Sequence, residues 1–376
     1  MPQRLKGRRN LRPVSPIYVC GPIAEPGRPA KGGYQTRNLR TIEALQTRGI
    51  EVHALPYAQP DSSRIGKLIA YATGFFVLAL RVAAVKKKSI VHITGLRRVF
   101  LYPELALVYL AKSRKCRVIY DIRDGLDLDA VWLKRSAVYR YFFSRILHAV
   151  DLVMVQGDGQ VPFVRSFTGK TPVLMPNQID LSALPARHYS DRGSSTPVIA
   201  YAGAVKPEKG VATILEAAEI LTRMGSEVIV RIAGTGDAAF IEELRARYAD
   251  IRVEWLGAQT TERVLDLFST SHFFLFPTWW PGEGQSNALT EAMACGCVPI
   301  VSDHGFNAAT VGDCGAILDL DQSAADYASA VERIWRGDLW EDLSHRATAR
   351  VQQRFASAAV IDHLTEQYVE LERGFA

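Results

Sequence analysis

In each half of the chain, apolar runs rich in β-branched residues alternate with helical patterns. These runs are continuous rather than alternately apolar and polar, which is typical of parallel strands covered by helices on both faces. In the first half the predicted strands are 17–22, 51–57, 90–95, 117–122, 151–156 and 172–176. In the second half they are 198–205, 228–234, 253–257, 273–277, 298–303 and 315–318. The pattern predicts an α/β fold with two doubly wound parallel-sheet domains.

The length of 376 residues also favours two domains, because one hydrophobic core rarely serves so long a chain. The segment 181–197 is rich in Ser, Pro and charge, so we interpret it as a linker. This gives domains at 1–180 and 198–355, followed by a C-terminal helical segment, 356–376. Parallel sheets bind ligands at the carboxyl ends of their strands, so we expect both domains to offer loops to a shared cleft.

The stretch "PGEGQSNALTEAMACG" (281–296) places two acidic residues around a predicted helix start. Glu283 lies in the loop after a strand, and Glu291 lies on a helix that is apolar on most sides. A carboxylate in such surroundings needs a cation, backbone donors or ligand hydroxyls. The free amides of Gly284 to Asn287 at the helix start would bind an anion. Two acids beside an anion site match a nucleotide-sugar, in which ribose and hexose flank a diphosphate.

Two lysines, Lys206 and Lys209, precede the helix that follows the strand 198–205. The helix dipole disfavours cations there, so the pair indicates a bound anion such as phosphate; an exposed surface turn is the alternative. Gly234 and Gly236 follow another strand, where they would let a ligand approach the backbone or simply form a turn. The same alternatives hold for Gly32 and Gly33. Neither glycine pair has the G-x-G-x-x-G pattern of nicotinamide dehydrogenases.

Charge is distributed unequally between the halves of the chain. Residues 1–180 contain 29 Lys and Arg against 12 Asp and Glu, whereas residues 181–376 contain 16 against 27. The basic half is expected to meet an acidic partner, preferably anionic lipid or a phosphorylated acceptor, unless the charge serves solubility alone. Nucleic acid is not expected as a partner, because the basic residues are scattered and no nucleic-acid motif occurs.

The segment 65–88 raises the question of membrane contact. Its apolar core, 68–80, has 13 residues, fewer than the ~20 needed to span a bilayer. A helix here could lie on a membrane surface with Lys86, Lys87 and Lys88 toward lipid headgroups, or form part of the domain core. No secretory signal is expected, and the five cysteines have no paired metal spacing. We expect reduced thiols in a cytoplasmic protein, peripheral at the inner membrane face.

Several blocks of the second half together resemble the retaining glycosyltransferases of family four, the glycosyl transferases group 1. These blocks are "YAGAVKPEKG", "IAGTGD", "WLGAQTTERVLDLFSTS", "FPTWWPGEG" and "SNALTEAMACGCVPIVSD". The E-x7-E spacing of Glu283 and Glu291 fits the signature of that family. The resemblance implies the GT-B fold, with two Rossmann-like domains facing across a cleft and a last helix that returns to the first domain.

The resemblance also implies roles for individual residues. Lys209 and Glu283 would be the catalytic residues, Lys209 at the donor diphosphate and Glu283 at the sugar hydroxyls. Glu291 would bind the ribose. The remaining donor-binding residues would be Lys206, Gly284, Gln285, Ser286, Asn287, Gly234, Gly236 and Gly257. Neither metal nor other cofactor is expected, because lysine and helix amides would neutralise the phosphates.

The chain departs from the family at three places. Ala204 stands where an arginine is usual, and Lys206 is a possible substitute for that cation. Gln285 replaces an aromatic or aliphatic residue, which could alter contacts with the donor sugar. In the segment 303–313, Phe306 stands where the family has a second glycine, and its following Glu is replaced near Ala309.

Residues of the first half are candidates for the acceptor side: Gly32, Gly33, Tyr34, His92, Arg123 and Asp124. His92 lies in an apolar strand, where a hydrogen-bonded core histidine is the more common finding. In the second half, Trp279 and Trp280 would flank a sugar ring or pack the loop. The sequence thus predicts a retaining, metal-independent hexosyltransferase that uses a UDP- or GDP-sugar and a glycan or lipid-linked acceptor in bacterial surface polysaccharide synthesis. The alternatives are a catalytically silent nucleotide-binding subunit and another GT-B enzyme such as a sugar epimerase.

Overall fold

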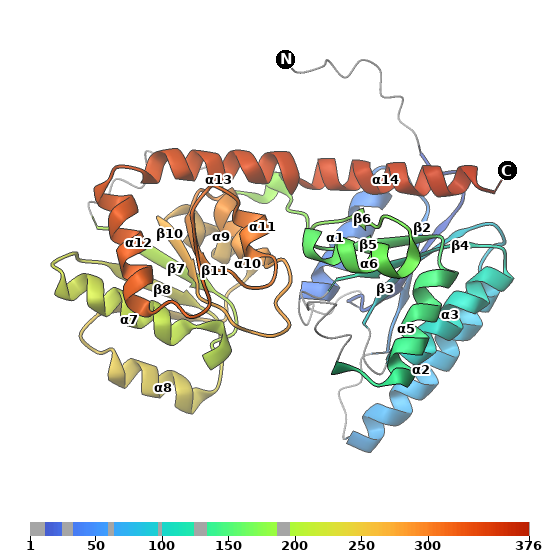
Figure 1. Cartoon of the computed structure of the whole chain (residues 1–376), viewed down its shortest axis with the longest axis horizontal. Helices are drawn as coiled ribbons and strands as arrows, with labels where there is room; N and C mark the ends of the chain where they lie inside the picture. Colours follow the sequence, from blue (N-terminus) through green and yellow to red (C-terminus); the bar gives the residue numbers. More distant parts are fainter. Residues whose placement is uncertain are drawn as a thin grey trace, which may run out of the picture. The chain divides into compact units, whose positions relative to one another are not determined.

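A computed structural model describes residues 12–24, 33–58, 64–96, 100–123, 134–185 and 196–375. These residues form two compact units (Figure 1). Unit 1 draws on Met1–Arg123, Asp127–Pro176 and Ala358–Ala376, and unit 2 contains Asn177–Ser357. The chain therefore leaves unit 1 after Pro176, and the described parts of the segment interpreted as a linker, 181–185 and 196–197, group with unit 2.

Unit 1 is built on one six-stranded parallel sheet in the order β2-β1-β3-β4-β5-β6. Its strands are β1 (Ile17–Gly21), β2 (Val52–Pro56), β3 (Ile90–Gly95), β4 (Arg117–Ile122), β5 (Leu152–Val155) and β6 (Val173–Leu174). Each coincides with one of the six predicted runs. The predicted parallel sheet is confirmed, because β1 pairs with β2 on one side and with β3 on the other.

Helices cover both faces of this sheet, as its continuous apolar strands require. The helices are α1 (Gly33–Thr47), α2 (Arg64–Ala84), α3 (Leu101–Ser113), α5 (Ala137–Ala149), α6 (Val161–Thr168) and α14 (Ser357–Arg373). Side chains of α2, α3, α5 and α6 share one buried cluster with the sheet. On the other face α1 packs through Ile42 and Leu45, and α14 through Val360, Ile361, Leu364 and Tyr368.

Unit 2 repeats the plan with a parallel sheet in the order β12-β11-β10-β7-β8-β9. Its strands are β7 (Val198–Ala202), β8 (Ile229–Ala233), β9 (Arg252–Gly257), β10 (Phe273–Phe276), β11 (Val298–Ser302) and β12 (Ala316–Leu318). Its helices are α7 (Val211–Arg223), α8 (Ala238–Arg247), α9 (Thr261–Ser269), α10 (Asn287–Ala294), α11 (Asn307–Val311), α12 (Ala324–Arg336) and α13 (Trp340–Arg354).

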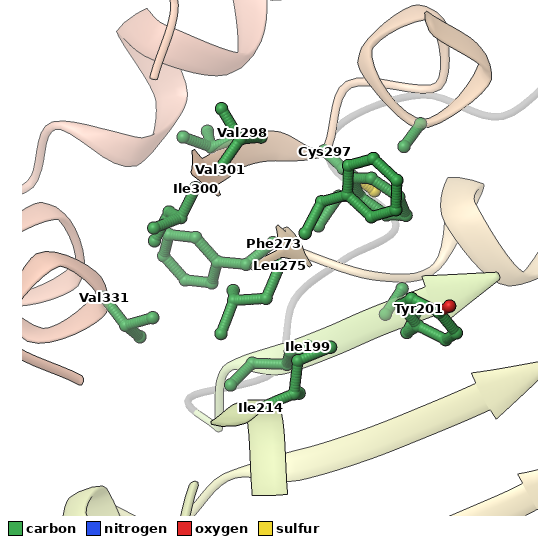
Figure 2. Close-up of a cluster of buried hydrophobic side chains, with 14 of the residues drawn as sticks. Ile199, Tyr201, Ile214, Phe273, Leu275, Cys297, Val298, Ile300, Val301 and Val331 are labelled. Carbon is green, nitrogen blue, oxygen red and sulfur yellow. The ribbon is translucent and has the colours of Figure 1, made fainter. Parts of the chain in front are cut away.

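The core of unit 2 is centred on β7, β10 and β11. Figure 2 shows Ile199, Phe273 and Ile300 from these strands gathered in one apolar cluster. Ile214 of α7 and Val331 of α12 close the cluster. Because this centre is rigid and fully buried, the loops leaving the carboxyl ends of its strands start from fixed positions.

Candidate active site

The strand order of unit 2 reverses between β7 and β10. From β7 the sheet continues through β8 to β9, whereas from β10 it continues in the other direction through β11 to β12. Ligands of doubly wound folds bind outside the carboxyl ends of the strands at such a reversal. The loops at this point are 203–210 after β7 and 277–286 after β10, and they contain most of the predicted donor-binding residues.

A single 3₁₀ turn, Pro207–Lys209, leads from the first loop into α7. Gly210, the N-cap of α7, has a φ of +73°, and a Cβ there would lie 2.2 Å from the carbonyl oxygen of Pro277. Only glycine combines this conformation with so close an approach. The second loop bonds back to the turn, because Trp279 N donates to the Glu208 carbonyl at 2.9 Å, and Thr278 Oγ1 lies 3.3 Å from the same oxygen. The two loops are therefore held together.

This arrangement brings Lys209 and Glu283 into an ion pair. Lys209 Nζ donates to Glu283 Oε2 at 2.5 Å, and the two side chains are 18% and 10% exposed. Thr278 Oγ1 donates to the same carboxylate oxygen at 3.0 Å. A charge-assisted bond at this distance in a largely buried setting fixes both groups. The sequence predicted that both residues belong to the site but not that they contact each other.

Lys206 is a second cation near the indole of Trp280. Its Nζ lies 5.4 Å from the centroid of the Trp280 ring, and Lys209 Nζ lies 5.9 Å from it. Trp280 thus gathers two ammonium groups at one ring by cation–π attraction. Only Lys209 is neutralised by Glu283. Ala204, in place of the usual arginine, is exposed in the same loop, and Tyr201 Oη donates to its carbonyl at 2.8 Å.

The helix that carries the second acid begins at Asn287. Ser286 is the N-cap of α10, and its hydroxyl accepts from Leu289 N at 3.4 Å. Across the described residues, the backbone N–H groups of Gly284, Ser286 and Asn287 donate to no protein acceptor. Glu291 follows one turn along α10 and is partly exposed. Open amides at the start of a helix form an anion site, and here an acidic residue lies on either side of it in the chain.

The family pattern suggested that the Gln285 side chain contacts the donor sugar, but the structure gives it a different role. Its side chain is buried: Oε1 accepts from Asn177 N at 2.6 Å, and Nε2 donates to Thr290 Oγ1 at 3.3 Å. Asn177 Nδ2 donates in return to the Gln285 carbonyl and to Asn287 Oδ1, both at 2.8 Å. The Gln285 side chain therefore points into the protein and holds the loop 277–286 to Asn177, where the chain enters unit 2.

The two glycines after β8 are required by packing between adjacent loops. A Cβ on Gly234 would lie 1.8 Å from the Gly203 carbonyl oxygen, and one on Gly236 would lie 1.9 Å from that of Val205. Gly257, at the end of β9, has a φ of +65°, and its carbonyl accepts from Gly234 N at 2.7 Å. Packing explains the lack of a side chain at Gly234 and Gly236, and backbone conformation explains it at Gly257, in each case without reference to a ligand.

Two contributors to the site were not predicted. Gly305 has a φ of +59°, and a Cβ there would lie 2.4 Å from the Glu283 carbonyl oxygen. The loop after β11 therefore packs against the backbone of Glu283. Thr278 orients the same carboxylate through its hydroxyl. A glycine or a threonine in a loop carries no signal for such a contact. In the same loop as Gly305, His304 Nε2 lies 2.7 Å from the Trp280 carbonyl oxygen, so this hydrogen bond holds the backbone of the loop after β10.

The acceptor-side candidates lie in unit 1. Gly33 begins α1, and Tyr34 follows it, partly exposed. His92 is buried, with Nδ1 2.8 Å from Tyr368 Oη and Nε2 3.3 Å from Asp121 Oδ2. It is therefore a hydrogen-bonded core histidine rather than an open ligand. Arg123 follows β4 and pairs with Asp121. The two remaining candidates, at positions 32 and 124, lie outside the described residues.

No group of three or more His, Cys, Asp or Glu side chains in the described ranges is arranged to hold a metal ion. The cations and helix amides described above are the groups of this site that can receive a phosphate. All five cysteines are free, and burial raises the pKa of Cys20 to about 12.

The chain was compared with known proteins. The family model "Glycosyl transferases group 1" matches residues 187–354. The D-inositol 3-phosphate glycosyltransferase of Mycolicibacterium smegmatis is 23% identical in an alignment of length 399 that covers 92% of this chain and 88% of that protein. A second relative is the N-acetylgalactosamine-N,N'-diacetylbacillosaminyl-diphospho-undecaprenol 4-alpha-N-acetylgalactosaminyltransferase of Campylobacter jejuni. It is 23% identical in an alignment of length 324 that covers 80% of this chain and 82% of that protein.

Among solved structures, Anabaena HepE in complex with UDP superimposes with a TM-score of 0.71 at 14% identity, over 94% of this chain and 99% of that one. Sucrose-phosphate synthase from Thermosynechococcus elongatus gives 0.73 at 17% identity, over 96% and 100%. At these identities the likeness concerns the fold alone. Together with the two parallel sheets, the comparisons show that the chain has the GT-B fold and that its residues 187–354 match the group 1 glycosyltransferases.

Proposed function

We propose that the protein is a retaining glycosyltransferase that moves a hexose from a UDP- or GDP-sugar to a glycan or lipid-linked acceptor in bacterial surface polysaccharide synthesis. The observation that carries this proposal is the Lys209–Glu283 pair at the loop that leads into the open amides of α10. A cation, helix amides and two carboxylates supply partners for each part of a nucleotide-sugar.

The roles follow from the chemistry of these groups. Lys209, Lys206 and the α10 amides receive the diphosphate and stabilise the charge that develops on it as the bond from the sugar C1 to the phosphate oxygen breaks. Glu291 accepts hydrogen bonds from the ribose, and Glu283 from the hexose hydroxyls. The acceptor oxygen forms the new bond to C1 on the face that the phosphate leaves. Its proton passes to the departing phosphate, so no separate base and no metal ion are needed.

Names of similar proteins support the choice of substrates. HepE was solved with UDP and also with UDP-glucose. The names of both curated relatives describe glycosyl transfer and contain a phosphate or diphospho group. A nucleotide-diphosphate donor and a phosphorylated acceptor are therefore the substrates to test first.

One observation favours a second candidate, a subunit that binds nucleotide without turning over a sugar. Ala204 leaves the first loop one cation short of the family pattern. Lys206 would compensate, because it lies at the Trp280 ring where the paired Lys209 also lies.

Incubation with UDP-, GDP- and ADP-sugars, followed by quantification of released nucleotide, separates these candidates. We expect one nucleotide-sugar to be turned over, slowly with water and faster with acceptor, and the new linkage to keep the donor's anomeric configuration by NMR. Nucleotide binding without any turnover would favour the silent subunit. An isomeric nucleotide-sugar as the product would identify an epimerase instead.

We also propose peripheral contact with an anionic membrane through α2. This helix lies beside α3, which in turn lies beside α5 (Figure 1). Its outer side exposes large apolar side chains at helical spacing: Ile69, Phe76, Val77 and Leu80. The exposed Lys86, Lys87 and Lys88 follow it directly. No helix in the described ranges is long and apolar enough to cross a bilayer. An apolar stripe with lysines at its end suits a headgroup interface.

Vesicle co-sedimentation tests this contact. Each lysine near an anionic surface contributes about 1 kcal/mol to binding, so binding to vesicles with 30% anionic lipid should fall steeply as the salt concentration rises. The double substitution Phe76→Ser plus Leu80→Ser should also reduce binding, because it removes exposed apolar side chains of α2. Met224→Ser, which changes an exposed apolar residue of unit 2, is the matched control. Equal binding of both variants and the unchanged protein would contradict a role for α2.

A further inference from the structure

Unit 1 contains a buried group of charges that the donor site does not use. Arg37, Asp121 and Arg123 are 5%, 0% and 6% exposed. Asp121 lies near the end of β4, Arg123 directly follows that strand, and Arg37 lies on α1. Arg37 interacts electrostatically with both other residues. Two buried guanidinium groups therefore interact with one buried carboxylate.

The hydrogen bonds of this group are incomplete on one side. Asp121 Oδ2 accepts from Arg123 Nε at 2.6 Å and lies 3.3 Å from His92 Nε2, and Arg123 Nη2 also contacts it. Within the described part of the chain, Arg123 Nη1 and Asp121 Oδ1 are buried and have no hydrogen-bond partner. An unpaired guanidinium N–H in a buried place is unfavourable unless a ligand completes it.

The described neighbours His92 and Tyr368 add no negative charge to this group. His92 is buried between Asp121 and Tyr368, and burial lowers its pKa, so it is neutral at neutral pH. Burial raises the pKa of Tyr368, so its hydroxyl keeps its proton. Arg37 Nη2 donates to the carbonyls of Met175 and Pro176, which carry no net charge.

We propose that Arg123, supported by Arg37, binds a phosphate group of the acceptor at the carboxyl end of the unit 1 sheet. Guanidinium forks match phosphate oxygens, and a phosphate would supply the acceptor that Arg123 Nη1 lacks among the described residues. Asp121 then has two effects: it orients Arg123, and its negative charge weakens the binding of the anion. This inference rests on the proposed transferase function, because it names the acceptor class of that reaction.

The test uses full-length protein saturated with UDP, so that the donor phosphate site is occupied. Calorimetric titration with sn-glycerol 3-phosphate should show binding, and glycerol should show none; inorganic phosphate reports the phosphate contribution without an ester. We expect Arg123→Gln to weaken binding of the ester at least about tenfold, because it removes a charged fork. Asp121→Asn should strengthen it, because the competing negative charge is lost.

The two substitutions should change the affinity for the ester in opposite directions. In a purely structural ion pair, either substitution would only lower the melting temperature. Absence of ester binding to the unchanged protein, or equal binding by Arg123→Gln, would overturn the proposal. Should Arg123→Gln not fold, Arg123→Lys keeps the charge and should bind the ester more weakly than the unchanged protein; equal affinity would likewise overturn it. If the protein does not bind UDP, the result counts against the proposed function instead. The same titration is then made with Lys209→Met, which removes the cation of the donor phosphate site.

Discussion

Replacing Glu283 by glutamine should strengthen binding of UDP while it reduces glycosyl transfer. In the structure Lys209 Nζ is bonded to Glu283 Oε2 at 2.5 Å, so a diphosphate must compete with this carboxylate for the ammonium group. UDP has no sugar, so it offers Glu283 nothing in return. The glutamine variant keeps the shape of the side chain and removes the competing charge.

The size of the effect follows from the geometry of the pair. At an effective dielectric constant of about 20, charges 2.5 Å apart attract by roughly 6–7 kcal/mol before desolvation is subtracted. A charged hydrogen bond retains about 1.5–3 kcal/mol of this as a net contribution. Because Lys209 is 18% exposed and solvent screens the pair, we take a value around the lower limit of that range, about 1–2 kcal/mol. UDP should therefore bind roughly 5- to 30-fold more tightly to Glu283→Gln.

Calorimetric titration of UDP measures this directly, and turnover of the nucleotide-sugar should fall about 10²- to 10³-fold in the same variant, because a sugar contact is lost. Thr278→Val is the matched control: it removes the hydroxyl that contacts Glu283, the Glu208 carbonyl and Trp280 N but leaves the Lys209–Glu283 ion pair, so UDP affinity should stay within about threefold. Unchanged or weaker binding of UDP to Glu283→Gln would refute the idea that this carboxylate competes with phosphate for Lys209.

Three further outcomes are expected. Gly305→Ala should destabilise unit 2 by about 1–3 kcal/mol in urea titration and lower turnover, because its φ is +59° and a Cβ would meet the Glu283 carbonyl; wild-type stability would contradict this. Gln285→Leu should cost about 1–3 kcal/mol, because Asn177 N then lacks its buried acceptor, and an unchanged melting curve would refute that role. For His92, burial lowers the pKa below 6.5, so the unfolded chain binds more protons and stability falls as the pH drops from about 7.5 to 5.5. His92→Gln should flatten this dependence by up to about 1 kcal/mol in thermal melts, and an identical slope would contradict the assignment.

Much of the fold was predictable because its pattern is local. Continuous apolar strands separated by helices identify a doubly wound sheet, and all twelve predicted runs coincide with the twelve strands. The point where the chain leaves unit 1 was harder to predict. Composition marked the polar segment 181–197, but the described parts of it group with unit 2, because Ile179 already pairs with Ala356 there.

The site could be predicted by residue type but not by contact. Glu283 and Lys209 were identified through the resemblance to the family, yet their ion pair depends on loops 74 residues apart. Gln285 was assigned to the donor sugar, whereas its partner Asn177 lies 108 residues earlier in the chain. The electrostatic interaction of Arg37 with Asp121 and Arg123 likewise joins residues that are far apart in the chain. Such long-range pairings are set by the packing of the sheet, and no local pattern encodes them.

The measurement that tests the central claim most directly is a crystal structure of the protein with UDP bound. We predict the diphosphate between Lys209 and the amides of Gly284 to Asn287, with the ribose hydroxyls within hydrogen-bond distance of Glu291. A nucleotide bound elsewhere, with its phosphates remote from Lys209 and its ribose remote from Glu291, would contradict the account.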